Sequence, residues 1–219
     1  MNKLQTMLIT LAVSSVTAFS VQAQEVKGDA KAAEQKIAMC IGCHGIKGYQ
    51  ASFPEVYRVP MISGQNAKYI VNALNAYKKG ERKHPTMRGI AESLSEQDMA
   101  DMAAYYEQHG KTATPAPAAA PADAKVAALL QKGACVSCHG DNFSKPVDPG
   151  YPKIAGQHKD YLFVALKSYK VENQATWGRS NGVMGGIAKQ FSNAELKALA
   201  NYVGSQEGEL KTIPQSKFR

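Results

Sequence analysis

The sequence predicts an all-α protein built from two tandem copies of one domain, and three observations support this. A set of motifs recurs 92 to 97 residues later within the 219-residue chain. Apolar residues recur at helical spacing, as at Leu196, Leu199, Ala200 and Val203. No run of alternating polar and apolar residues predicts a β-sheet.

The repeat combines apolar positions with residues of special chemistry. Residues 40–44 (CIGCH) return as 135–139 (CVSCH), residues 60–65 as 152–157, residues 87–91 as 184–188, and Tyr69 and Tyr77 as Tyr161 and Tyr169. The separation drifts by only a few residues, so insertions between the copies are small. This pattern predicts a duplicated domain.

Each copy is predicted to contain three main helices. The first spans about residues 29–39 and 123–132, and the middle one about 66–79 and 158–171. The last begins at Ser95 and Ser192, which are followed three residues later by Asp98 and Glu195. A Ser followed at that spacing by an acidic residue is typical of a capping box at a helix start.

Residues 1–23 are predicted to be a signal peptide. Lys3 provides a positive start, residues 7–19 are short and mostly apolar, and Ala23 ends a segment of small residues suited to cleavage. A membrane span would need about 20 predominantly apolar residues. We therefore expect an exported, periplasmic protein.

The mature chain is predicted to hold domain 1 at residues 24–111 and domain 2 at residues 123–219. Residues 112–122 between them are rich in Pro and Ala. Pro115, Pro117 and Pro121 argue against an Ala-rich helix in that segment. We therefore expect an extended linker.

The net charge of +8 is unevenly distributed. Residues 24–112 carry 12 basic and 10 acidic side chains, whereas residues 113–219 carry 13 and 8. Nucleic acid is not an expected partner, because the protein is exported and no basic cluster recurs at helical spacing. The charge instead suggests mild steering of protein partners, and it would also suit peripheral association with a membrane surface.

The four cysteines all fall in Cys-x-x-Cys-His motifs, at Cys40, Cys43, Cys135 and Cys138. This is the attachment signature of c-type haem. Two thiols on one helical turn reach the two vinyl groups of the porphyrin, and His44 or His139 then approaches the iron. A disulfide framework would not require these histidines, a zinc site would need a second pair of ligands, and a thioredoxin-like motif would need a βαβ unit.

A second axial ligand is predicted at Met87 and Met184. Met184 is the single methionine of residues 113–219, and the repeat pairs it with Met87 rather than with Met39, Met61, Met99 or Met102. Met with His is a pairing that raises the potential of electron-transfer haems. Ordinary core packing is the alternative role for these methionines. His84, His109 and His158 are rival ligands, but none has a histidine counterpart in the other copy.

Pro60 and Pro152 are predicted to supply the backbone carbonyls that hold the ligand histidines in one tautomer. Each could alternatively be a simple loop residue. Several aromatic side chains could pack on haem faces or propionates, although a core position is the simpler interpretation at helical spacing. They are Tyr77, Tyr105, Phe163, Tyr169, Trp177 and Tyr202.

Taken together, these motifs resemble those of the dihaem class I cytochromes c of the c4 type. The resemblance covers nearly all of the mature chain and rests on both Cys-x-x-Cys-His motifs, on residues 151–158 (YPKIAGQH), and on the segments 87–106 and 184–202. It implies two cytochrome c domains with the class I haem fold, related by approximate twofold symmetry, and His/Met ligation of two covalently bound haem c groups. Phe191 in place of Leu and the Pro/Ala-rich linker depart from the pattern, and the linker leaves the packing of the two domains open.

The expected function is single-electron transfer rather than catalysis, because two irons with both axial positions filled leave no place for a small-molecule substrate. A quinol–cytochrome c oxidoreductase or a dehydrogenase is the expected donor, and a terminal oxidase or reductase the expected acceptor. One alternative is a dihaem cytochrome subunit of a flavocytochrome or other dehydrogenase complex. Another is a dihaem peroxidase or gas sensor, which would need an open iron.

Overall fold

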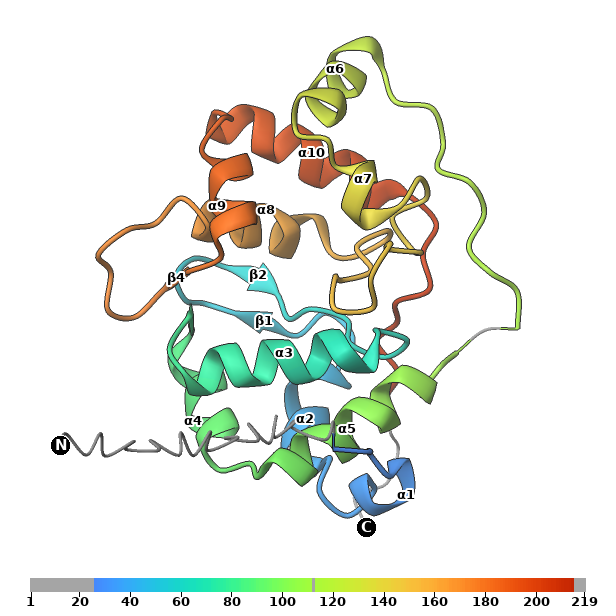
Figure 1. The fold of residues 1–219 in the computed structure, drawn as a ribbon, viewed down its shortest axis with the longest axis vertical. Coiled ribbons are helices and arrows are strands. Elements are labelled where there is room, and N and C mark those ends of the chain that lie inside the picture. The colour runs from blue at the N-terminus through green and yellow to red at the C-terminus, as the bar shows by residue number, and fades with distance from the viewer. Residues whose placement is uncertain (1–25, 112, 215–219) are drawn as a thin grey trace, which may run out of the picture.

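The computed structural model describes residues 26–111 and 113–214, so the predicted signal peptide lies outside the described residues. The chain is mostly helical, as predicted (Figure 1). The first domain contains α1 (Ala30–Ala33), α2 (Ala38–His44), α3 (Ala67–Lys78), α4 (Pro85–Glu92) and α5 (Glu96–Gln108). The second contains α6 (Ala124–Lys132), α7 (Val136–His139), α8 (Lys159–Ser168), α9 (Gly182–Ala188) and α10 (Asn193–Ser205).

The structure adds two antiparallel strand pairs that the sequence does not predict. β1 (Gln50–Ala51) pairs with β2 (Tyr57–Arg58), and β3 (Arg82–Lys83) pairs with β4 (Gly178–Arg179). Each strand has two residues, which is too short for an alternating pattern to be recognised. The β3–β4 pair joins the two domains and places Arg82 opposite Arg179.

The helix ends show which helix boundaries the sequence predicted correctly and which it did not. Both predicted capping boxes are present at Ser95 and Ser192, at the starts of α5 and α10. The predicted helix at residues 29–39 is instead divided: Asp29 caps the short α1, and a turn separates it from α2. The Cys-x-x-Cys-His segments and the two methionine segments form helices of their own, which the prediction of three main helices omitted.

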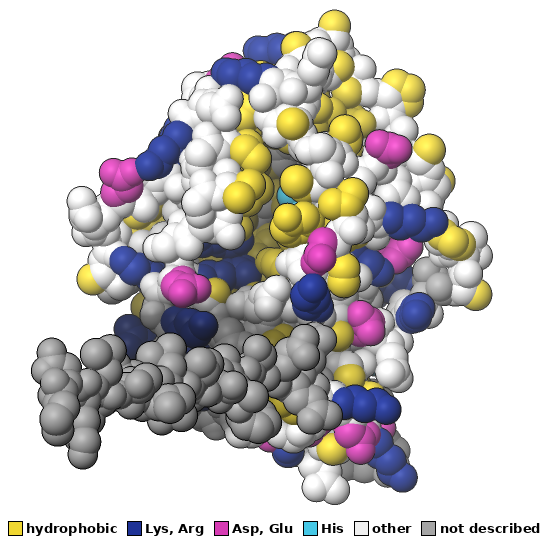
Figure 2. Space-filling model, viewed as in Figure 1, with side chains coloured by type: hydrophobic (Ala, Val, Ile, Leu, Met, Phe, Trp, Pro, Cys, Tyr) yellow, Lys and Arg dark blue, Asp and Glu magenta, His cyan; other side chains and the backbone are white. Residues whose placement is uncertain are grey.

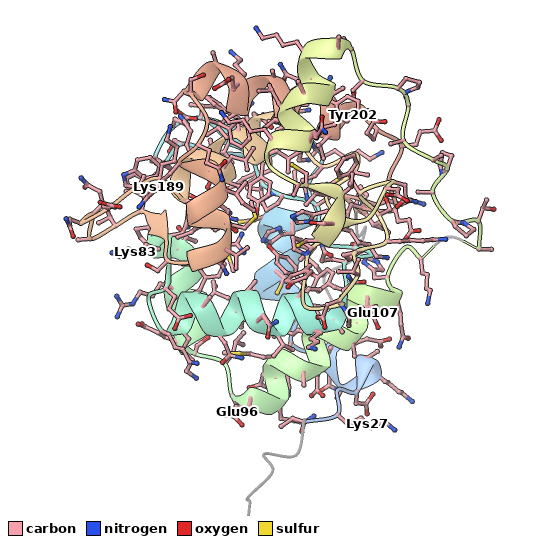
Figure 3. The ribbon with its side chains drawn as sticks, turned by 45° about the horizontal axis from the view of Figure 1, so that its top comes forward. Lys27, Lys83, Glu96, Glu107, Lys189 and Tyr202 are labelled. Atoms are coloured by element: carbon pink, nitrogen blue, oxygen red, sulfur yellow. The ribbon has the colours of Figure 1, made fainter. Side chains whose placement is uncertain are left out.

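Each domain has its own apolar core around its last helix. In the first domain, Met99 and Met102 of α5 are buried against Ile41 of α2 and Ile70 of α3. Glu107 of α5 also accepts a hydrogen bond of 2.8 Å from the N–H of Ala67 at the start of α3 (Figure 3). The second core holds two clusters of buried residues, one formed by Phe143, Ala155, Leu162, Ala200 and Val203 and the other by Leu129, Phe191, Leu196 and Leu199.

The two domains pack directly against each other, which the linker had left open. Arg58 of β2 pairs with Asp160 of α8 at 3.0 Å, and Lys167 pairs with Glu55 at 2.6 Å. Residues 113–122 form no helix where they are described. They lie along the second domain, where Tyr202 of α10 donates a hydrogen bond of 2.7 Å to the carbonyl of Ala120 (Figure 3). None of the helices within the described residues has the length and apolar character needed to span a bilayer.

Candidate haem-binding sites

The two motif histidines make the same contact in the two domains. His44 ends α2, and its Nδ1 lies 2.8 Å from the carbonyl oxygen of Pro60. His139 ends α7, and its Nδ1 lies 3.1 Å from the carbonyl oxygen of Pro152. Since a carbonyl only accepts, Nδ1 must carry the proton in each ring. Nε2 is then left with a lone pair, which is the form of imidazole that binds a metal.

Burial favours the neutral form of both rings. Burial lowers the pKa of His44 and of His139 below the usual value, and the hydrogen bond to the proline carbonyl only partly opposes this effect. A neutral imidazole needs to lose no proton before it binds iron. The local structure therefore favours the ligand form of both residues.

The four motif cysteines are partly buried, and none forms a disulfide. Cys40 and Cys43 lie on α2, while Cys135 caps α7 and Cys138 lies within it. Burial raises the pKa of the Cys40 thiol to about 11. A thiol that resists ionisation is a poor thiol–disulfide exchange group. These positions fit covalent attachment of a cofactor better than redox chemistry of the sulfur itself.

The two candidate methionine ligands sit in matching short helices. The backbone N–H of Met184 in α9 donates to the Asn181 side chain at 2.9 Å, and that of Met87 in α4 donates to His84 Nδ1 at 3.4 Å. Both methionines are partly buried. The rival methionines Met99 and Met102 are core residues, exposed by 1% and 2%.

The remaining histidines have other contacts. His84 caps α4, and His158 occupies the cap position of α8. Nδ1 of His109 lies 3.0 Å from the hydroxyl of Ser63, and its ring packs on Tyr105 with a centroid distance of 4.9 Å.

In the second domain, apolar side chains surround a hollow over α7, α8 and α9, and histidine is visible inside it (Figure 2).

Two arginines that are not among the predicted site residues meet between the domains. Arg82 donates to the phenol oxygens of Tyr69 at 3.2 Å and Tyr161 at 2.7 Å. Arg179 donates to Tyr161 at 3.1 Å and to Tyr169 at 3.4 Å. Neither arginine has a carboxylate partner among the ion pairs of the described residues. Nε of Arg82 is buried without any partner.

This arginine–tyrosine cluster, defined by Arg82, Arg179 and their three phenol partners, lacks negative charge. Burial alone would raise the pKa of Tyr161, but the two guanidinium groups outweigh it and lower the pKa to about 8. A haem carries two propionate carboxylates, and a bidentate guanidinium suits a carboxylate. The orphaned Nε and the unpaired charges therefore fit the acidic edge of a haem. The internal repeat could have predicted this pair of arginines, because Arg82 and Arg179 are separated by 97 residues, as Met87 and Met184 are.

Comparison with known proteins agrees with these features. The cytochrome c family model matches residues 30–110 and 124–207. Cytochrome c4 of Stutzerimonas stutzeri is 31% identical over 218 residues, covering 93% of this chain and 98% of the relative. The chain belongs to the cytochrome c4 family. The crystal structure of reduced recombinant cytochrome c4 from Pseudomonas stutzeri aligns with a TM-score of 0.59 at 28% identity, covering 82% of this chain and all of that one.

Two cytochrome c domains imply two covalently bound haem c groups, and the protein is a dihaem electron carrier of the cytochrome c4 type. Its cytochrome c4 relatives are electron carriers. Another relative, 31% identical over 197 residues and covering 83% of this chain and 85% of its own, is the thiosulfate dehydrogenase electron acceptor of Stutzerimonas stutzeri strain A1501.

Proposed function

We propose that each domain holds one haem c through its own motif and that the protein carries single electrons between respiratory partners in the periplasm. The thioether attachments are Cys40 and Cys43 in the first domain, and Cys135 and Cys138 in the second. His44 and Met87 would hold the iron of the first haem, and His139 and Met184 would hold that of the second. Pro60 and Pro152 orient the histidines, and the arginine–tyrosine cluster receives propionates.

One observation carries this assignment: the same histidine–proline contact occurs in both copies. It fixes the Nδ1–H tautomer of His44 and His139 and leaves the Nε2 lone pair of each ring available for a metal. Such a matched pair is not needed for folding, because a buried imidazole could satisfy its Nδ1 through water or a side chain. Its presence at both Cys-x-x-Cys-His motifs supports two equivalent haem sites.

When bound, the haems would supply the one-electron chemistry, and the residues of the chain around them would control access to partners. Val136 lies between the two cysteines of the second motif and is 42% exposed, while Val183 precedes Met184 and is 66% exposed. An exposed apolar rim suits brief contact with a redox partner over a small interface. The basic excess of residues 113–219 would speed such encounters at low salt. The predicted signal peptide supports export to the periplasm.

A second candidate role is electron acceptor of a thiosulfate dehydrogenase. It is favoured by relatives of that name, from Thiomonas intermedia and Stutzerimonas stutzeri, which are 29% and 31% identical. Reduction of the oxidised protein by a purified thiosulfate dehydrogenase in a stopped-flow instrument would support this role. Rapid reduction by a quinol–cytochrome c oxidoreductase, with none by the dehydrogenase, would favour the general respiratory carrier.

The haem assignment is tested by a haem count and a visible spectrum of the mature protein. We expect two haems per chain, both low-spin, with the weak far-red band of Met–iron ligation in the oxidised state. Met184→Ala should remove half of that band, and Met87→Ala the other half. Met99→Leu, a change in the core, is the control and should keep the whole band. A full-strength band in Met184→Ala would reject the ligand assignment of the second haem.

A further inference from the structure

Gln65 and Gln157 occupy equivalent places in the two domains, and each side chain reaches into the other domain. Gln65 Oε1 accepts from the N–H of Lys153 at 2.9 Å, and its Nε2 donates to the carbonyl of Lys153 at 3.0 Å. Gln157 does the same with Met61, at 3.0 Å and 2.9 Å. The two amides therefore form a reciprocal, crossed pair of contacts.

The contacted peptides are those that orient the ligand histidines. The N–H of Met61 belongs to the same planar peptide group as the carbonyl of Pro60, which accepts from His44. The N–H of Lys153 shares its peptide group with the carbonyl of Pro152, which accepts from His139. A peptide group is conjugated, so a hydrogen bond at its N–H polarises its C=O. Each histidine thus ends a short hydrogen-bonded chain that begins at a glutamine of the other domain.

Both glutamines are held in place. Each is 4% exposed. The Oε1 of Gln65 also accepts from the N–H of Asn66 at 3.0 Å, and that of Gln157 from the N–H of His158 at 3.0 Å. With two N–H donors facing Oε1 and a carbonyl facing Nε2, only one orientation of each amide satisfies its partners. The glutamines are therefore fixed acceptors rather than adaptable surface groups.

We propose that Gln65 and Gln157 are crossed positioning residues, each of which tunes the axial histidine of the haem in the opposite domain. This inference rests on the proposed function. An acceptor at the peptide N–H strengthens the proline carbonyl as an acceptor for Nδ1–H. A stronger hydrogen bond there makes the imidazole more basic and favours oxidised iron. The potential of each haem consequently depends on docking of the other domain.

The test is a redox titration of the holoprotein with Gln65→Leu and Gln157→Leu. Gln65→Leu should raise the midpoint potential of the second haem and leave the first unchanged, and Gln157→Leu should do the reverse. The haems are distinguished by methyl-labelled methionine in NMR spectra, since Met184 is the single methionine of residues 113–219. Asn66→Ala is the control: it removes a hydrogen bond of 3.2 Å to the carbonyl of Tyr151 but leaves the Pro152–Lys153 peptide group bonded.

A change in potential confined to the haem of the mutated domain would overturn the proposal. Variants that hold two haems and keep both wild-type potentials would overturn it as well. A change of equal size at both haems in each variant would also overturn it, because the crossed contacts predict a change at the opposite haem alone. If the variants do not fold, amide hydrogen exchange of the wild-type holoprotein decides: the amides of Met61 and Lys153 should exchange slowly, and exchange at the rate of open loops contradicts the proposal. Absence of haem from the wild type would instead refute the proposed function.

Discussion

Arg82 in the first domain donates a hydrogen bond of 2.7 Å to the phenol oxygen of Tyr161 in the second. The same phenol oxygen also accepts from Arg179 at 3.1 Å. One phenol therefore connects two cationic groups that belong to opposite domains and that have no carboxylate partner among the ion pairs of the described residues. Each domain contributes a strand to this boundary, and Lys83 beside Arg82 donates to the carbonyl of Gln174 (Figure 3).

Replacement of Arg82 or Arg179 by Gln is expected to lower the midpoint potentials. A nearby cation favours reduced iron, which carries one positive charge less than oxidised iron. A unit charge about 10 Å away at an effective dielectric of about 20 contributes roughly 1–2 kcal/mol, on the order of 50 mV. Redox titration of Arg82→Gln and Arg179→Gln measures the change.

Arg58→Gln is the matched control for these variants. It removes the same charge from another contact between the domains, but Arg58 is 40% exposed in its side chain and already has Asp160 as its partner. Its potentials should stay close to those of the wild type. If Arg82→Gln and Arg179→Gln kept the same midpoint potentials as the Arg58→Gln control, the charge of the arginine–tyrosine cluster would have no effect on the haem potentials.

The sequence predicted the parts of this protein that depend on local spacing. The capping boxes at Ser95 and Ser192 and the helical class follow from residues a few positions apart. The crossed contacts of Gln65 could not be predicted in this way, because its partner Lys153 is 88 residues distant and a glutamine carries no signal of its partner. The break after α1 was also missed, since propensity alone does not specify a turn.

Asn181→Ala is expected to weaken the ligand helix of the second domain. The Asn181 side chain satisfies the N–H of Met184, and loss of such a cap costs about 1 kcal/mol. The free energy of unfolding should fall by roughly that amount, and reduced protein should bind carbon monoxide faster at the second haem. Asn201→Ala, an exposed change within α10, is the control. It should leave the rate of carbon monoxide binding unchanged and should leave the free energy of unfolding unchanged or slightly higher. Unaltered carbon monoxide binding in Asn181→Ala would argue against a role of this cap in holding the ligand.

Asp101 is expected to make the first domain the more sensitive to acid. Its side chain is buried and accepts from the N–H of Asp29 at 2.8 Å and from Gln97 Nε2 at 2.7 Å. Burial would raise its pKa, but these hydrogen bonds and Lys36 outweigh burial and lower it. Because the pKa is depressed, the stabilisation is present above the unfolded value of about 4 and is lost as the pH falls through the folded value. The equivalent residue of the second domain is Ala198.

The measurement compares thermal unfolding between pH 7 and pH 3. Far-ultraviolet circular dichroism follows the whole chain, whereas fluorescence of Trp177, the single tryptophan, reports on the second domain. Below about pH 4 the dichroism should fall before the fluorescence changes. Asp101→Asn should be less stable at pH 7 by about 1–3 kcal/mol and should show a shallower loss toward acid. If the stability of Asp101→Asn and of the wild type fell with pH in parallel, Asp101 would not be the cause of the acid sensitivity of the first domain.

Removal of both haems is expected to unfold most of the chain. Each domain buries only a modest apolar core, part of which is alanine, such as Ala33, Ala103, Ala155 and Ala200. Domains of about 90 residues bury a limited fraction of their surface, so a cofactor in the core contributes much of their stability. Without haem, the cationic cluster would keep Arg82 Nε buried and unpartnered, which is a further cost. We therefore expect chain made without haem attachment to give the dichroism of a largely unfolded polypeptide and to be digested rapidly by protease, whereas the holoprotein resists digestion. A colourless chain that melts cooperatively with full helix content would show that packing of the side chains alone holds the fold.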